Sequence, residues 1–506
     1  MRLGVEMSQA AERYLSLAPL AAVLISLIAA IFILLSSRRP NLRETWTIVA
    51  ALCQFSVVGS MIPAVLSGLQ PEVTLFEIIP GISLALKADP FGLSFALSAS
   101  LLWIFTSFYS IGYMRALKEH NQTRYFASFA VCLSATMGIA FAANLLTFLI
   151  FYEVLTISTY PLVIHKETAE AVSAGRKYLA FLLSAGVALL LAVGLTQMMA
   201  GTLNFTPGGF LPVSMGQAGL LGLFVLFLVG VGAKAGLMPL HSWLPTAMIA
   251  PTPVSALLHA VAVVKAGVFG FARVMGFVFG LQLAADIGAT TLTAVTSAAT
   301  VVLASLLAMA QDNLNRRLAY STIGHLSYII LGTVLLAPAG WLGGLFHITT
   351  HAAMKITLFF CAGAIYVKTG RENVSELDGI GKQMPLTMAA FTVGALGLAG
   401  VPPVGGFLSK WFLAQGTIET GQPILLAVLL LSGLLNAGYL FPIVVRAFFK
   451  PSKDFTKFDE ASPLMLVPLL LTAALALLLG IYPDGIFHFY SLSSQAVMNV
   501  LKGSTP

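Results

Sequence analysis

The sequence contains a series of apolar runs, each about as long as the hydrocarbon core of a membrane is thick. A helix needs about 20 consecutive apolar residues to cross that core, and such runs recur along nearly all of the 506 residues, of which 58% are hydrophobic and 9% are charged. Because lipid offers no partner to backbone polar groups, these runs are predicted to be helices. We predict about fourteen spans, at residues 15–36, 45–67, 91–113, 125–142, 145–164, 175–199, 218–249, 252–278, 285–309, 317–336, 340–367, 385–416, 423–446 and 463–483. The expected fold is an all-α polytopic membrane protein with a single transmembrane domain over residues 1–506.

Two of the predicted spans are unusually long and are interrupted by glycine and proline. The interruptions are GLMP within 218–249 and GVPPVGG within 385–416. In transporters, broken helices at corresponding positions of two halves expose backbone groups to the transport pathway. The two breaks lie five spans apart in the series above, so the two segments run in opposite directions, as inverted repeats require. We therefore predict two inverted repeats, residues 125–278 and 285–446, each with one broken helix.

The basic residues predict the orientation of the chain. Most of the 27 lysines and arginines fall in loops that follow odd-numbered spans, whereas Lys87 is the one in a loop between spans that follows an even-numbered span. Cytoplasmic loops carry the excess of lysine and arginine in membrane proteins. The odd-numbered loops are therefore predicted to be cytoplasmic, and both termini are predicted to face the outside of the inner membrane.

Composition also excludes several kinds of site. The net charge of +7 is scattered over short loops rather than gathered on one face, which argues against nucleic-acid binding. The three cysteines, Cys53, Cys132 and Cys361, all lie within apolar runs and lack the spacing of a disulfide framework, a zinc site or an iron–sulfur cluster. No glycine-rich nucleotide loop follows a strand pattern. We expect no cofactor and no metal, and no redox chemistry in this chain itself.

Several ionisable residues lie within the predicted spans, where charge is expensive. The set consists of Lys234, Lys265, Arg273, Lys355, Lys410 and Glu153. A lysine at the bilayer centre costs about 2.5–3.5 kcal/mol to insert, so ionisable groups at that depth are by default functional. Lys410 and Arg273 lie nearer the ends of their spans, where a long side chain can extend to the interface. For Arg273 we favour that interpretation over function, and for Lys410 both remain open.

Histidines accompany these charges in the second half of the chain. His347, His351 and Lys355 are spaced at i, i+4 and i+8, which places them on one face of a helix, and His325 lies in the preceding span. Histidine titrates near neutrality and can exchange protons at both ring nitrogens. For His347 a hydrogen-bonding helix contact is the alternative, and for His241, which follows a proline break, the alternative is capping of freed carbonyl groups.

The combination of lysine, glutamate and histidine at mid-membrane depth indicates proton transfer. Removing a lysine from water favours its neutral form, whereas a nearby carboxylate favours its charged form. Movement of the two groups relative to each other can therefore switch a lysine between holding and releasing a proton. The pattern predicts a proton path with a gate. A pocket for an organic substrate would instead need aromatic and amide groups that converge on one cavity.

One long segment contains several of these residues and resembles a known family. The segment KAGLMPLHSWLPTAMIAPTPVSALLHAVAVVKAGVF (234–269) is similar to the proton-conducting membrane transporter family, which comprises the antiporter-like subunits of respiratory complex I, of membrane-bound hydrogenases and of Mrp-type cation/proton antiporters. The resemblance extends from about residue 85 to residue 485. It includes KADPFGLSF (87–95), FYEVLTISTYPL (151–162), AMAQDNLNRRLAYSTIGHLSYIILG (308–332), HITTHAAMKITLFFCAGAI (347–365) and GLAGVPPVGGFLSKW (397–411).

The resemblance implies a role for each intramembrane residue. Glu153 and Lys234 would form a gating pair beside the helix break at Pro239, and Lys265 would be a relay lysine. Lys410 would be the terminal proton carrier; one type of complex I subunit has glutamate at this position, whereas other types and Mrp subunits have lysine. The residues implied to connect the two half-channels are His325, His347, His351 and Lys355.

Three functions agree with this resemblance. The chain length and Lys410 are most similar to D-type subunits of Mrp antiporters, which implies exchange of protons for a monovalent cation such as Na⁺. The alternative is a proton-pumping subunit of a complex I-like NADH–quinone oxidoreductase or an energy-converting hydrogenase. A further alternative is a proton-coupled partner in inorganic-carbon uptake. In each case the expected partners are other membrane subunits of a hetero-oligomeric complex, together with protons and the lipid bilayer.

Overall fold

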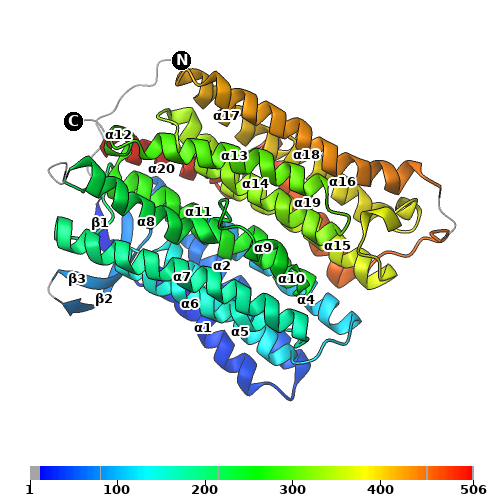
Figure 1. Cartoon of the computed structure of the whole chain (residues 1–506). Helices are drawn as coiled ribbons and strands as arrows, with labels where there is room; N and C mark the ends of the chain where they lie inside the picture. Colours follow the sequence, from blue (N-terminus) through cyan, green and yellow to red (C-terminus); the bar gives the residue numbers. More distant parts are fainter. Residues whose placement is uncertain (1–11, 80, 213–215, 452–453, 504–506) are drawn as a thin grey trace.

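A computed structural model of the chain describes residues 12–79, 81–212, 216–451 and 454–503, without the side chains of residues 79, 258 and 259. The two termini themselves lie outside these ranges. Long helices run side by side along a common direction (Figure 1). They are α1 (Ala18–Leu35), α2 (Pro40–Ser60), α3 (Ile62–Leu66), α4 (Pro90–Ala116), α5 (Gln122–Ala140), α6 (Leu145–Val163), α7 (Ala169–Ala200), α8 (Gln217–Ala235), α9 (Trp243–Thr246), α10 (Thr252–Ala256), α11 (Val263–Val274), α12 (Leu281–Asp286), α13 (Ala289–Met309), α14 (Leu314–Val334), α15 (Pro338–Thr369), α16 (Pro385–Ala399), α17 (Gly405–Glu419), α18 (Pro423–Phe449), α19 (Pro463–Ile481) and α20 (Phe489–Gly503).

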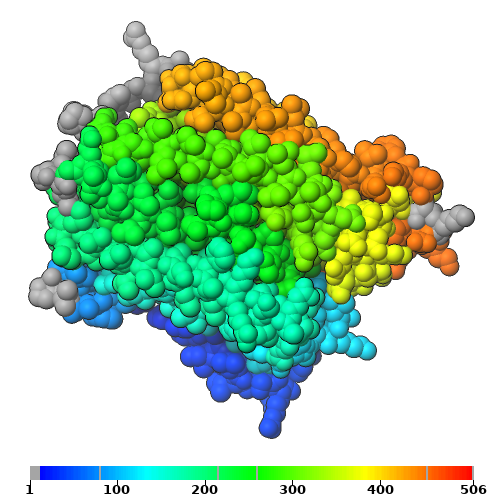
Figure 2. Space-filling view, viewed as in Figure 1, coloured from blue at the N-terminus to red at the C-terminus, as the bar shows by residue number. Residues whose placement is uncertain are grey.

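The helices follow the order of the chain across the visible face of the molecule. In Figure 2, α1 and α2 protrude at one edge, the C-terminal helices α16–α18 lie at the opposite edge, and the central segments lie between them. The helix α15 is buried at the centre of the bundle and packs against α4, α14, α16, α17 and α19. The two histidines and the lysine that α15 contributes to the predicted path are therefore buried inside the bundle rather than facing lipid.

The membrane architecture predicted from the apolar runs is confirmed, whereas the count of fourteen spans is not. Ten helices of the described residues are long and apolar enough to cross a membrane. The four other predicted spans contain α5, α10 with α11, α14, and α16 with α17. These segments are broken, as in α10–α11 and α16–α17, or rich in polar side chains that face other helices, as in α14. These four segments therefore do not meet the combined requirement of helix length and mean hydropathy that the ten other helices meet.

Both predicted helix breaks are present, and side chains bond the carbonyl groups that they free. Helix α8 ends at Ala235, where Gly236 adopts a φ of +69°, and α16 ends at Ala399, where Gly400 adopts a φ of +92°. Glycine tolerates this left-handed conformation, which terminates a helix. The ring Nε1–H of Trp243 donates to the carbonyl of Ala233 at 2.8 Å. At the second break, the side chains of two residues described below donate to the carbonyl of Leu398.

The segment predicted as the span 252–278 is also irregular. It contains α10, a π-helical turn at Leu257–Val261, α11 and a second π-helical turn at Met275–Phe279. π-Helical turns are rare in proteins, and those that occur are often located at functional sites. Lys265 lies in the first turn of α11, directly after the first of these irregular segments.

A small β-sheet lies at one end of the bundle and was not predicted (Figure 1). Strand β2 (Gln70–Ile79) pairs in parallel with β1 (Arg13–Leu15) and in antiparallel with β3 (Ile82–Lys87). Strands of this length fall below the window of about 20 residues that detects membrane spans. The sheet leads directly into Asp89, which caps α4 by accepting a hydrogen bond from the backbone N–H of Gly92 at 2.7 Å.

Arg273 is buried in an ion pair, so the interpretation that it extends to the membrane surface is wrong. Its side chain is 2% exposed, and two of its nitrogen atoms donate to the carboxylate of Asp89 at 2.5 Å and 2.7 Å. Four phenylalanine rings surround the guanidinium group, with ring centroids 4.6–5.5 Å from Cζ. A paired arginine among aromatic rings joins the start of α4 to the end of α11.

Breaking this pair should destabilise the fold. We expect Arg273→Ala to cost about 3–5 kcal/mol, because removal of one partner leaves the carboxylate of Asp89 buried without its counter-charge. Thermal unfolding of the detergent-solubilised protein measures the effect. The control is Lys368→Ala, which removes a partly exposed ion pair with Asp459 and should cost no more than about 1 kcal/mol. Equal melting temperatures for the two variants would contradict the structural role of the buried pair.

Candidate functional site

Lys234 and Glu153 lie next to each other at the first helix break. Lys234 is in the last turn of α8 and is fully buried. Its ammonium group donates a hydrogen bond to the backbone carbonyl of Tyr152, the residue before Glu153 on α6, and lies 3.3 Å from the centroid of the Tyr152 ring. Within the described residues, the hydrogen bond of Lys234 goes to this carbonyl, and no ion pair joins it to the carboxylate of Glu153. Lys234 therefore contacts the peptide group that precedes Glu153, and not the carboxylate of Glu153.

The carboxylate of Glu153 lies against the neighbouring helix α7. Its Oε1 is buried and accepts no hydrogen bond from the described part of the chain. A methyl group added at Gly186 of α7 would lie 2.4 Å from this oxygen. The absence of a side chain at Gly186 is thus what leaves room for the carboxylate. An acceptor without a donor in such a place is free to take a proton or to accept a bond from a moving cation.

Lys265 begins a second group of polar contacts. Its Nζ lies 2.8 Å from Nδ1 of His351, and both side chains are buried. Helices α8 and α11 touch closely here, since a Cβ at Gly267 would lie 2.4 Å from the backbone nitrogen of Ala235. No hydrogen bond that the structure describes joins Lys265 to Lys234. The close packing nevertheless places the two lysines on adjoining helices.

The three histidines of the predicted path form one cluster between α14 and α15. Nδ1 of His325 lies 3.1 Å from Nε2 of His347, and the rings of His325 and His351 stack with centroids 5.3 Å apart. His347 in turn contacts the hydroxyl of Ser409 on α17 at 2.7 Å. The predicted i, i+4 face is therefore correct, and His325 completes it from the neighbouring helix. Nε2 of His351 has no partner in the described structure.

Asn436 on α18 connects this cluster to the other lysines, and it was not predicted from the sequence. Its amide nitrogen lies 3.2 Å from Nε2 of His325 and donates to the carbonyl of Leu398 at 3.1 Å. Its amide oxygen accepts from the hydroxyl of Tyr439 at 2.7 Å, which also contacts Ser321 at 2.7 Å. Asn436 and Tyr439 are uncharged, so nothing in the sequence distinguishes them from other polar residues in apolar helices. Their contacts were found only in the structure.

The contacts of Asn436 define the direction of the hydrogen bonds. An amide N–H can only donate, so Nε2 of His325 is the acceptor and a neutral His325 carries its proton on Nδ1. That proton points to Nε2 of His347, whose own proton then lies on Nδ1 and points to Ser409. The three side chains form a chain of donors and acceptors with a single orientation.

Lys355 and Lys410 each contact a group that is also bonded to Asn436 or to its partner Tyr439. Nζ of Lys355 donates to the hydroxyl of Ser321 at 2.8 Å and to the carbonyl of Leu318 at 3.3 Å. Nζ of Lys410 donates to the carbonyl of Leu398 at 2.5 Å and lies 5.0 Å from the centroid of the Tyr328 ring. The ammonium group of Lys410 is directed into the bundle at the second helix break. This geometry disagrees with the hypothesis that Lys410 extends outward to the interface.

His241 does not take part in these contacts. It lies in the irregular segment between α8 and α9, and its Nδ1 is buried without a hydrogen-bond partner in the described residues. The ring of His241 interacts with the backbone of Pro239, as the predicted capping requires, and Trp243 donates to the carbonyl of Ala233 at the same break. The structure thus brings together Lys265, Lys355, Lys410 and the three histidines, and places Glu153 with Lys234 in an adjoining group.

A bundle with two broken helices and a buried row of lysines and histidines defines a class of antiporter-like membrane subunit. Comparison with known proteins agrees: residues 142–435 match the family model described as NADH:quinone oxidoreductase/Mrp antiporter, TM. The chain belongs to this family, which includes subunits of complex I, of hydrogenases and of Mrp antiporters.

Relatives from different complexes match most of the chain. NADH-quinone oxidoreductase subunit N of Desulforudis audaxviator is 32% identical over 79% of this chain and 80% of its own. The D-type subunit of the Na(+)/H(+) antiporter of Bacillus subtilis is 26% identical over 88% of this chain and 92% of its own. Among solved structures, a chain of the archaeal membrane-bound sulfane sulfur reductase has a TM-score of 0.86 and 26% identity, with 97% of this chain and 99% of that chain covered. Relatives of this kind are subunits of multisubunit membrane complexes.

The space left by Gly186 provides a test of the Glu153 position. We expect Gly186→Ala to displace the carboxylate, because its new methyl group would lie 2.4 Å from Oε1 of Glu153. Ion-coupled transport in membrane vesicles should fall by about tenfold, since a shift of about 1 Å in a reacting group has effects of this size or larger. The control is Gly194→Ala on the same helix, where no atom lies within 4 Å of the added methyl group. Equal transport by both variants, at equal amounts of assembled protein, would show that the position of this carboxylate is unimportant.

Proposed function

We propose that this chain is the proton-translocating subunit of a Mrp-type antiporter, which exchanges a monovalent cation, Na⁺, for protons across the inner membrane. The observation that carries the proposal is the polar network around His325 and Asn436, to which Lys265, Lys355 and Lys410 are joined through His351, Ser321 and the carbonyl of Leu398. The similarity to the D-type subunit of a Na(+)/H(+) antiporter, which extends over nearly the full length of both chains, supports the Mrp assignment. The partners are other membrane subunits of the same complex.

In the proposed path, Glu153 and Lys234 form the gate. Lys234 donates to a backbone carbonyl rather than to the carboxylate, so a rotation of either side chain can form or break their direct contact. A direct ion pair favours the charged lysine, and its loss favours release of a proton. The released proton passes to Lys265 on the adjoining helix and then to His351.

The second part of the path extends from the histidines to Lys410. His325 and Asn436 connect His351 with Lys355 on one side and with Lys410 on the other. Lys410, next to the second helix break, is the terminal proton carrier. Lysine, histidine and hydroxyl groups exchange protons, whereas Na⁺ prefers a cage of oxygen ligands such as carboxylates. Glu153 is the one carboxylate of this set, which favours H⁺ as the ion carried by this chain.

The second candidate function is proton pumping driven by a redox partner. The similarity to NADH-quinone oxidoreductase subunit N favours it, at 32% identity over 79% of this chain. In that case the same buried path would translocate protons, and the energy would come from electron transfer in other subunits. Everted vesicles that contain the whole complex distinguish the two. Collapse of a preformed pH gradient on addition of Na⁺ supports the antiporter, and formation of a gradient on addition of NADH or H₂ supports the redox-driven pump.

Lys410→Arg tests whether this lysine must release a proton. Arginine preserves the charge and the length of the side chain but does not deprotonate in proteins. We expect Lys410→Arg to lose Na⁺-dependent collapse of the pH gradient almost completely. The control Lys382→Arg, which makes the same change at an exposed residue between α15 and α16, should retain it. Full transport by an assembled Lys410→Arg complex would refute the role of Lys410 as the terminal carrier.

The orientation of the chain is part of the proposal. The charge distribution favours a cytoplasmic location for the loops that follow odd-numbered spans and an outside location for both termini. Alkaline phosphatase fused to the C-terminus should therefore be active, and a green fluorescent protein fusion should be dark. A phosphatase fusion truncated after Lys118, in a predicted cytoplasmic turn, should be inactive. The opposite pattern would mean that the span map contains an error.

A further inference from the structure

Two connecting turns at the same end of the bundle bring three potential metal ligands together. Glu119 and His120 lie in the turn between α4 and α5, and His165 lies directly after α6. Their ligand atoms all fall within 4.8 Å of one another. Nε2 of His165 is 3.7 Å from Oε2 of Glu119, and Nδ1 of His120 is 3.9 Å from the same oxygen. The group lies at the end of the bundle, apart from the lysine and histidine network described above.

His165 is the residue that most needs a partner. Its side chain is 0% exposed, and neither ring nitrogen has a hydrogen-bond partner among the described residues. A buried polar group without a partner costs about 1–3 kcal/mol, and such groups in native proteins call for an explanation. The neutral imidazole is the form that binds metal ions.

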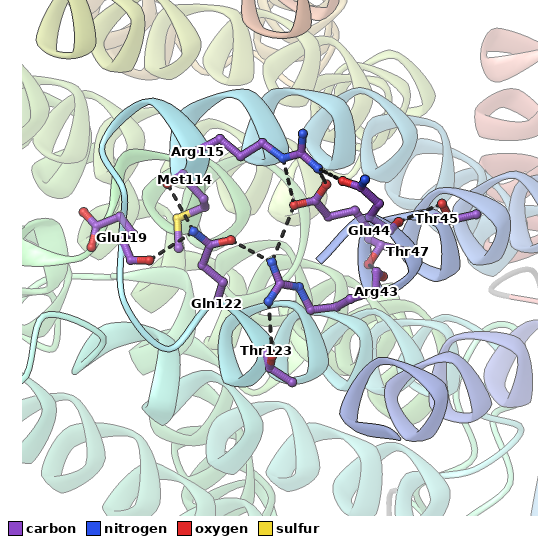
Figure 3. A network of polar contacts seen from close by, with 10 residues as sticks. Arg43, Glu44, Thr45, Thr47, Met114, Arg115, Glu119, Gln122 and Thr123 are labelled. Carbon is purple, nitrogen blue, oxygen red and sulfur yellow. Dashed lines mark hydrogen bonds and ion pairs between the residues drawn. The ribbon is translucent and has the colours of Figure 1, made fainter. Parts of the chain in front are cut away.

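The turn that carries Glu119 is held in place by a polar network behind it (Figure 3). The amide nitrogen of Gln122 donates to the backbone carbonyls of Glu119 at 3.0 Å and Met114 at 3.3 Å. The amide oxygen of Gln122 accepts from Arg43 at 2.7 Å. Figure 3 shows that the carboxylate of Glu119 points away from this network. The backbone of Glu119 is thus fixed, while the ion-pair contacts of its carboxylate in the described structure are to the two histidines alone.

We propose that Glu119, His120 and His165 bind a divalent transition-metal ion of the Zn²⁺ class. Two imidazoles and one carboxylate are a ligand set that Zn²⁺ uses in proteins, with bonds of about 2.0–2.2 Å in a tetrahedral arrangement. Ligand atoms of such a site lie about 3.3–3.6 Å apart, which follows from those bond lengths. The separations of 3.7 Å and 3.9 Å approach that range. Small side-chain rotations complete the site, and water or a further carboxylate takes the fourth position.

Charged groups of both signs surround the proposed site. Glu167 approaches His120 to 3.9 Å, and it is also paired with Arg124 at 2.6 Å. Arg124 donates to the backbone carbonyl of His165 at 3.4 Å. Glu119 and Glu167 together balance the charges of Arg124 and of Lys166, which follows His165 in the chain. A bound metal would link the α4–α5 turn to the end of α6, the helix that carries Glu153.

Cobalt binding tests the proposal directly. The purified complex, free of histidine tags and treated with a chelator, is titrated with Co²⁺ and then with Zn²⁺. We expect about one Co²⁺ per chain with the visible absorption of a four-coordinate site, displaced by Zn²⁺. His120→Ala, which changes an exposed residue, and Glu119→Gln should each weaken binding by at least about tenfold, since each removes one ligand. His488→Ala, an exposed histidine beside Asp484, is the matched control and should bind normally.

A substitution of the buried ligand provides a positive signal. His165→Cys replaces an imidazole by a thiolate, which is also a zinc ligand, and should add a sulfur-to-cobalt charge-transfer band that the original protein lacks. Absence of saturable Co²⁺ binding in the original protein would overturn the proposal. Binding that is unchanged in both His120→Ala and Glu119→Gln would overturn it equally, because the metal would then occupy another place. Thermal unfolding of each variant shows that it is folded.

Discussion

The structure depends on how a bundle of low dielectric accommodates the ammonium groups of three buried lysines and of the partly buried Lys410. Removing such an ion from water costs several kcal/mol even after relaxation, and the cost is offset only where hydrogen-bond partners are supplied. Lys234, Lys355 and Lys410 each donate to a backbone carbonyl. The fourth, Lys265, contacts the ring nitrogen of His351. A carbonyl or an imidazole satisfies the donor but does not neutralise its charge. Backbone carbonyls, one of them at the second helix break, thus provide acceptors without supplying counter-ions.

Arg273 shows the opposite solution within the same bundle. It has a full counter-charge in Asp89, two short hydrogen bonds and a shell of aromatic rings. Arginine does not deprotonate in proteins, so this arrangement fixes a permanent charge for a structural purpose. Arg273 and the four lysines thus represent two classes of intramembrane cation, which differ in the charge of their partners. A cation with a carboxylate partner joins helices, whereas a cation with neutral partners is suited to proton exchange.

The parts of this arrangement differ in how far sequence predicts them. The apolar runs predicted the membrane helices, and glycine with proline predicted both breaks, because those residues act through local backbone geometry. The histidine and lysine face of α15 also followed from helical spacing. The partner of Arg273 is 184 residues away, and Asn436 and Tyr439 carry no charge that marks them in an apolar helix. Contacts of this kind depend on which helices become neighbours, and a span map does not contain that information. The strands β1–β3 are too short to register in a hydropathy window of membrane-span length.

The carbonyl of Leu398 accepts hydrogen bonds from both Lys410 and Asn436. Two donors that share one acceptor influence each other, since a stronger bond from one weakens the attraction available to the other. Asn436 also donates to His325, so this peptide oxygen links Lys410 to the histidine cluster by hydrogen bonds, in addition to the direct charge interaction between Lys410 and His325. Such an influence is reciprocal by thermodynamic necessity: whatever free energy the protonation of Lys410 transmits to His325, the protonation of His325 returns to Lys410. One oxygen at the end of a broken helix thereby couples two ionisable groups on different helices.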